Sequence, residues 1–141
     1  MAEIMKLHYT VDGDDFTRAG ETSSKVKKTL NQLGFDPGVV KKVAIAMYEG
    51  EINMVIHANG GTIDVDISPE EIVIVMQDVG PGIPDIEKAM QEGFSTADHN
   101  VRELGFGAGM GLPNMKRYTD YMDIQSTVGE GTTITMRVNI E

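Results

Sequence analysis

The chain has 141 residues and a formal net charge of −10, with no cysteine and no tryptophan. This length fits one domain that buries a core without metal or disulfide support, and the lack of cysteine excludes a disulfide framework or a cysteine metal site. No apolar run is long enough to span a membrane and no signal-peptide pattern opens the chain, which predicts a cytoplasmic protein. The acidic charge argues against nucleic-acid binding. Residues 1–141 are expected to form a single domain.

The first half of the chain predicts an edge strand and two helices. Apolar and polar residues alternate weakly over residues 5–11, which predicts a strand. Apolar residues recur at helical spacing over residues 16–33, which predicts a helix. Gly34 ends that helix, and Pro37 opens a longer one that reaches about residue 58. The longer helix carries two apolar stripes, which indicates packing on more than one side.

This long helix also carries a polar pair. At about 100° per residue, Glu49 and Asn53 lie on one face one turn apart, whereas Glu51 points roughly to the opposite side. The pair lies between the two apolar stripes, which favours a joint chemical role over the alternative of a solvated i,i+4 pair. Gly50 costs the helix about 1 kcal/mol relative to alanine, which points either to close packing or to weak activity.

The second half of the chain predicts four more strands and helices that cover one side of them. The strands are expected at 62–67, 72–76, 122–127 and 132–140. The unbroken apolar run at 72–76 is typical of a central strand covered on both faces. A short helix is expected at 84–90, a mobile cover at 92–104 and a further helix at 112–118. This order predicts an α+β two-layer sandwich with a mixed, mostly antiparallel sheet.

Two glycine-rich segments have the character of ligand-binding loops. Residues 78–84, Asp-Val-Gly-Pro-Gly-Ile-Pro, follow a strand directly, and such glycines let backbone bend around a ligand beside one fixed acceptor. Residues 105–111, Gly-Phe-Gly-Ala-Gly-Met-Gly, precede a helix, where backbone N–H groups can meet phosphate oxygens. The alternative for the second segment is a flexible linker, against which its large apolar residues argue.

Four motifs occur in a specific order: Glu49-x-x-x-Asn53, Asp78-x-Gly80-x-Gly82, the glycine run 105–111, and Gly131-Thr132. Together they resemble the GHKL ATPase superfamily of gyrase, heat-shock chaperones, histidine kinases and MutL, in its Bergerat nucleotide-binding fold. Within that superfamily, residues 78–90 and 93–96 are most similar to the small stand-alone serine/threonine kinases of bacterial partner-switching systems, the anti-sigma factor and RsbT-type switch-kinase group.

The resemblance implies a protein that uses ATP and Mg²⁺. Glu49 would be the catalytic base, Asn53 would be the Mg²⁺ ligand, and Asp78 would accept a hydrogen bond from the adenine amino group. The nucleotide-binding residues that the resemblance implies are Asn53, Asp78, Gly80, Gly82, Ile83, Arg102, Gly105, Gly107, Ala108, Gly109, Met110, Gly111, Leu112 and Thr132. For Arg102 two roles stay open, a contact to the γ-phosphate on closure and a solvated loop arginine.

Two functions are compatible with this resemblance. The first is a Mg-ATP-dependent protein serine/threonine kinase that phosphorylates a STAS-type antagonist protein. The second is an ATP-gated anti-sigma factor or switch protein that acts mainly by binding a partner, such as a sigma factor, with little or no catalysis. Relatives of the anti-sigma type form homodimers, which implies the same assembly as an option here.

Overall fold

The computed structural model describes residues 5–12, 20–57, 60–80 and 111–140. Its elements, in chain order, are β1 (Met5–Asp12), α1 (Glu21–Gln32), α2 (Pro37–His57), β2 (Gly60–Ile67), β3 (Glu71–Asp78), α5 (Gly111–Arg117), β4 (Tyr121–Thr127) and β5 (Gly131–Asn139). The predicted helix at 84–90 and the predicted cover at 92–104 lie outside the described residues. That residues 1–141 form one domain stays a prediction.

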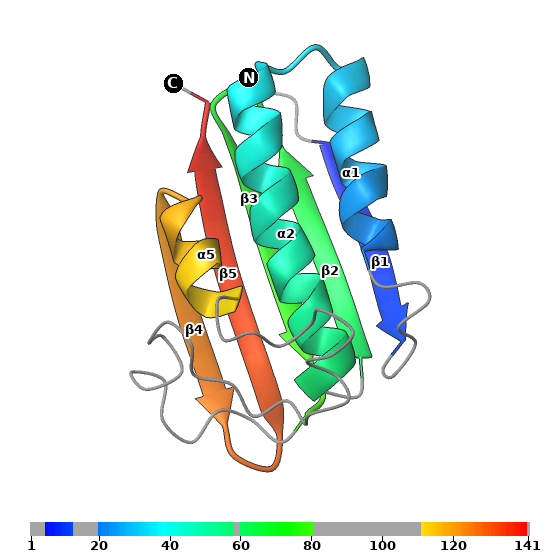
Figure 1. The fold of residues 1–141 in the computed structure, drawn as a ribbon, viewed down its shortest axis with the longest axis vertical. Coiled ribbons are helices and arrows are strands. Elements are labelled where there is room, and N and C mark those ends of the chain that lie inside the picture. The colour runs from blue at the N-terminus through cyan, green and yellow to red at the C-terminus, as the bar shows by residue number, and fades with distance from the viewer. Residues whose placement is uncertain (1–4, 13–19, 58–59, 81–110, 141) are drawn as a thin grey trace.

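The five strands form one open sheet in the order β1-β2-β3-β5-β4. Every neighbouring pair is antiparallel, so the sheet is more regular than the mixed, mostly antiparallel sheet predicted. The three described helices all lie on one face of this sheet (Figure 1). The predicted α+β two-layer sandwich is therefore confirmed, with the apolar core between the helix layer and the sheet.

Strand β3 differs from its prediction, because the described residues cover only one of its faces. Its burial alternates, with Ile72, Ile74 and Met76 buried under the helices and the residues between them partly exposed. Val73 and Val75 lie on the open face, and the backbone register sets them opposite Asp66 and Asp64 of β2. β-branched residues favour strands whether or not they are buried. An unbroken run of them therefore does not show that both faces of the strand are covered.

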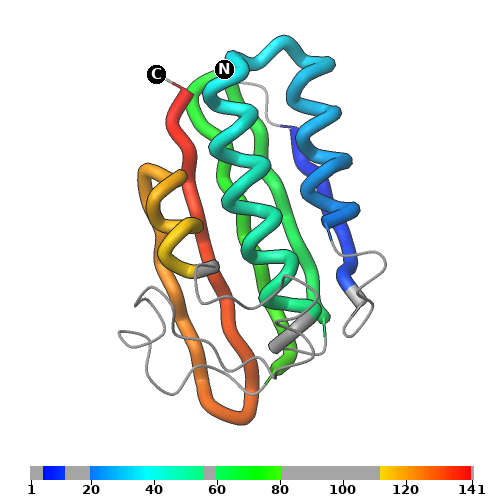
Figure 2. The backbone as a smooth tube through the Cα atoms, in the orientation of Figure 1, coloured from blue at the N-terminus to red at the C-terminus, as the bar shows by residue number. Residues whose placement is uncertain are grey.

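Helix α2 packs on more than one side, as its two apolar stripes predict. It lies over the sheet between α1 and α5, and Figure 2 shows α1 and α2 as adjacent, oppositely directed segments. Gly50 is buried where α2 packs on β3 and α5. A Cβ at this position would overlap the Met76 sulfur of β3 and lie 3.0 Å from the Met115 methyl group of α5. Close packing therefore accounts for the glycine in this helix.

A buried carboxylate joins α2 to the beginning of α1. The Glu51 side chain is 2% exposed. Its Oε2 accepts hydrogen bonds from the backbone N–H groups of Gly20 and Thr22, both at 3.1 Å, and its Oε1 accepts one from Ser23 at 2.9 Å. Helix α1 has no capping side chain of its own, so Glu51 satisfies amides that would otherwise be unpaired at the positive end of the helix dipole.

None of the helices within the described ranges combines the length and apolar character required to span a bilayer.

We expect Glu51→Ala to lower the free energy of unfolding by about 3 kcal/mol, because it removes a charged acceptor and leaves buried amides unpaired. Glu51→Gln should cost less, since it keeps one of the two acceptor oxygens. Urea denaturation followed by circular dichroism measures both changes. Glu70→Ala, in the exposed turn between β2 and β3, is the control and should change stability by less than about 0.5 kcal/mol. A Glu51→Ala protein as stable as this control would contradict the capping role.

Candidate functional site

The described parts of the predicted site converge at one end of the molecule. Strand β3 ends there and β5 begins there. The C-terminal half of α2 extends toward the same end, and α5 has its N-terminal end on that side (Figure 1). These elements are far apart in sequence and meet because β5 inserts between β3 and β4 in the sheet. The described parts of the motifs recognised separately in the sequence therefore lie toward a common end of the molecule.

Asp78 and Thr132 are in direct contact at this end of the sheet. The backbone N–H of Thr132 donates to Asp78 Oδ1 at 3.0 Å, and the Thr132 side chain is 6% exposed. Gly131 has φ +143°, and a Cβ at this position would collide with the Asp78 carbonyl oxygen. Glycine thus lets β5 approach the end of β3 closely, and this approach places Thr132 beside the carboxylate.

The Asp78 carboxyl group is partly removed from water. Burial raises the pKa of Asp78 above its ordinary value, while backbone hydrogen bonds from Thr132 and Gly80 act in the opposite direction. A carboxylate has about four lone-pair sites, so two backbone donors leave it able to accept from a ligand. This half-buried group therefore keeps the free acceptor sites that its predicted role requires.

The polar pair on α2 lies as predicted, away from the buried Glu51. Glu49 and Asn53 are both half-buried, one helical turn apart. Asn114 of α5 reaches across to the pair, with its Nδ2 atom 3.5 Å from Glu49 Oε1, a long hydrogen bond. The short helix α5 therefore contacts the predicted base directly.

The predicted residues of the loop regions divide into two groups. Gly80 is described and half-buried, Leu112 is 8% exposed in the first turn of α5, and Gly111 begins that helix. The remaining calls lie outside the described residues: Gly82, Ile83, Arg102, Gly105, Gly107, Ala108, Gly109 and Met110. On α5, Lys116 and Arg117 are exposed.

Three residues at or beside this site were not found from the sequence. They are Asn114, Glu51 and Ser126. Ser126 lies opposite Thr132 in the register of β4 and β5, and its Oγ atom is 2.9 Å from Thr132 Oγ1. For Ser126 a signal did exist, since counting back across the hairpin from Thr132 reaches it. No comparable local signal marks the other two, because Asn114 and Glu51 each contact an element distant in sequence from their own.

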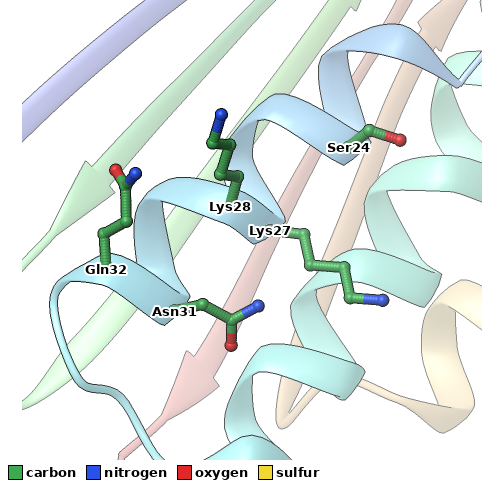
Figure 3. A pocket seen from close by; sticks show the side chains of 5 residues that line it. All are labelled: Ser24, Lys27, Lys28, Asn31 and Gln32. Atoms are coloured by element: carbon green, nitrogen blue, oxygen red, sulfur yellow. The ribbon is translucent and has the colours of Figure 1, made fainter.

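Two other features of the described residues lie outside the predicted site. A shallow hollow on the outer side of α1 is lined by Ser24, Lys27, Lys28, Asn31 and Gln32 (Figure 3). All five side chains are exposed on a single helix, and none belongs to the predicted site. Within the ranges that the structure covers, no group of three or more acidic or histidine side chains is placed to hold a metal ion.

The comparisons with known proteins agree with this geometry. Residues 38–141 match the family described as histidine kinase-, DNA gyrase B- and HSP90-like ATPases. The chain belongs to this family, whose members use ATP. The RsbU and RsbW domains of Rv1364c from Mycobacterium tuberculosis share the fold, with a TM-score of 0.64 and 16% identity over 95% of this chain and 32% of that chain.

Two relatives are similar in sequence as well. The serine/threonine-protein kinase RsbT of Bacillus subtilis is 35% identical over 112 residues, which cover 77% of this chain and 78% of that protein. The anti-sigma F factor of Thermoanaerobacter sp. strain X514 is 36% identical over 108 residues, which cover 72% of each. One relative is thus named as a kinase and the other as an anti-sigma factor.

Asp78→Asn tests the acceptor in two ways. The amide replaces one acceptor oxygen by a donor, so we expect ATP affinity, measured by calorimetry, to fall at least about tenfold. Because burial raises the pKa of Asp78, its ionised form costs stability at neutral pH, and this cost disappears as pH falls below the raised pKa. The stability of the variant relative to wild type should therefore be highest at pH 7 and decline toward pH 4. A relative stability that instead rises on acidification would contradict this account.

Proposed function

We propose that this chain is a Mg-ATP-dependent protein serine/threonine kinase that acts in the cytoplasm and phosphorylates a small STAS-type antagonist protein in a partner-switching system. The observation that carries the proposal is the pairing of Glu49 with Asn53 on one face of α2, at the end of the molecule where Asp78 and Thr132 meet. Family membership and the similarity to a serine/threonine-protein kinase support it.

Asp78 recognises the base in this proposal. Its carboxylate accepts a hydrogen bond from the adenine 6-amino group, with Gly80 and Gly82 leaving room for the ring. Guanine carries a carbonyl at the corresponding position, so a carboxylate that can only accept discriminates against it. Thr132 supports this end of the site through its N–H, which holds the Asp78 carboxylate in place.

Asn53 holds the metal ion through its side-chain oxygen. Mg²⁺ prefers hard oxygen ligands and usually takes only one or two from the protein, the others coming from phosphate and water, which fits a site without an acidic cluster among the described residues. When bound, Mg²⁺ supplies neutralisation of the charge on the phosphates. The glycine run 105–111 is proposed to meet these phosphates, with Arg102 as a further contact.

Glu49 removes the proton from the hydroxyl group that attacks the terminal phosphate. Asn114 donates to one carboxylate oxygen of Glu49, which restricts the rotation of the carboxylate and leaves the second oxygen able to receive the proton. The base is half-buried, so an incoming serine of a protein substrate can reach it. Most of the rate enhancement in phosphoryl transfer comes from positioning and electrostatic stabilisation, and the residues named here supply that positioning.

A second function is favoured by the similarity to the anti-sigma F factor. The chain would then bind a sigma factor or another switch partner in an ATP-dependent manner, with little catalysis. Pull-downs in ATP and in ADP separate the two functions. ATP-dependent recovery of a sigma factor without phosphate transfer favours sequestration, whereas transfer to an antagonist protein favours the kinase.

Glu49→Gln tests the proposed base. With radiolabelled ATP and the antagonist protein encoded nearest to this gene, transfer should fall at least about 100-fold, because the amide cannot take a proton. ATP affinity should stay within about threefold of wild type. Glu70→Gln, in the turn at the opposite end of the sheet, is the control and should transfer phosphate normally. Equal transfer by wild type and Glu49→Gln would rule out Glu49 as the base.

Asn114→Ala tests the contact between α5 and the base. We expect the turnover number to fall about fivefold while the KM for ATP stays within about twofold, since the role proposed for Asn114 is to orient Glu49 and includes no contact to the nucleotide. Steady-state kinetics with the same antagonist measures both constants. Lys116→Ala, exposed on the same helix, is the matched control. A rise in KM with unchanged turnover would show that Asn114 serves binding and not orientation.

A further inference from the structure

Three polar side chains lie side by side at one end of three neighbouring strands. Asp78 is at the end of β3, Thr132 is at the start of β5, and Ser126 is near the end of β4, paired with Thr132. Thr132 is buried beneath the helix layer and Ser126 is half-buried beside it. The row runs from the proposed adenine acceptor toward the edge of the sheet.

The contacts of Ser126 constrain the direction of the hydrogen bonds in this row. Ser126 Oγ is 3.2 Å from the Gly131 carbonyl oxygen, which carries no hydrogen, so the serine hydroxyl must donate in that contact. A hydroxyl group has a single hydrogen. In the 2.9 Å contact between Ser126 Oγ and Thr132 Oγ1, the hydrogen therefore comes from the threonine.

The threonine hydroxyl is left with lone pairs only. Its hydrogen points to Ser126, and the Thr132 backbone N–H points to Asp78 Oδ1. Both Asp78 and Thr132 therefore present acceptors and no donor. A purine 6-amino group has two N–H bonds and matches this arrangement, whereas a 6-oxo group is itself an acceptor and finds no partner.

We propose that Ser126 is a specificity-determining residue: by taking the hydrogen of the Thr132 hydroxyl, it keeps that hydroxyl an acceptor and so selects 6-amino purines over 6-oxo purines. This inference rests on the proposed function, because it requires adenine to bind beside Asp78. Ser126 acts through Thr132 and is a positioning residue. A purely structural role, in which the hydroxyl pair only joins β4 to β5, would change stability without changing the choice of nucleotide.

ATP and ITP are the probes that test this role. They share the ribose and triphosphate and differ at the 6-substituent and at the protonation of N1. In Ser126→Ala the threonine hydrogen loses its acceptor, so the hydroxyl can turn and donate to the 6-oxo group. We expect the preference for ATP over ITP, as a ratio of Kd values from calorimetry, to fall about fivefold, mainly through tighter ITP binding. Thr132→Val in the same background should abolish that gain.

Two controls separate this effect from a general change in the sheet. Ser126→Thr keeps a hydroxyl at the same position and should keep the wild-type ratio. Gln125→Ala changes an exposed residue on the opposite face of β4 and should also leave the ratio unchanged. An unchanged ratio in folded Ser126→Ala would overturn the proposal.

If Ser126→Ala does not fold, Thr132→Val decides the question alone. An acceptor-only hydroxyl predicts weaker ATP binding and no loss of ITP binding in that variant. Weaker ITP binding would show that the hydroxyl donates in the wild type and would overturn the proposal. The Asp78→Asn variant distinguishes a failure of the site itself: unchanged ATP binding there would overturn the proposed adenine site, whereas a changed ratio in Ser126→Ala requires that site to exist.

Discussion

The hydrogen bonds between the Glu51 carboxylate and the first amides of α1 are the constraint on which the rest of the structure depends. A buried charge is tolerated only with such partners, so the rotation of α2 about its own axis is set by the position of α1. Glu49 and Asn53 each lie two residues from Glu51, and two residues correspond to about 200° around a helix. Fixing Glu51 against α1 therefore places Glu49 and Asn53, the proposed base and the proposed metal ligand, on the other side of α2.

Two close backbone approaches bring the remaining parts together. Gly50 lets α2 sit directly on Met76 and Met115, so that the helix, the sheet and α5 share one junction. Gly131 lets β5 begin beside the end of β3, which is what makes the contact between Thr132 and Asp78 possible. A side chain at either position would push these elements apart. The geometry of the site thus follows from packing in the core as much as from the polar residues themselves.

The net charge of the protein means that a nucleotide can be bound only through local contacts. A chain with a net charge of −10 repels nucleotides in general, so ATP must be recognised by local contacts. In the proposed site the contacts at the base are acceptors, Asp78 and the Thr132 hydroxyl, to which adenine would offer donors. The contacts proposed at the phosphates are a metal ion and backbone groups.

The sequence by itself determined the elements with strong periodicity and the local motifs, including α2, the final hairpin, and the placement of Asp78 after a strand. Hydrophobic period and glycine spacing are local properties, so they can be read along the chain. Only the tertiary structure decided that the described residues cover β3 on one face, that Glu51 caps α1, that Asn114 contacts Glu49, and that Ser126 contacts the Thr132 hydroxyl. The contact of Ser126 lies within one hairpin. The other features depend on contacts between elements distant in sequence, and no local pattern specifies which side chain such a contact will reach.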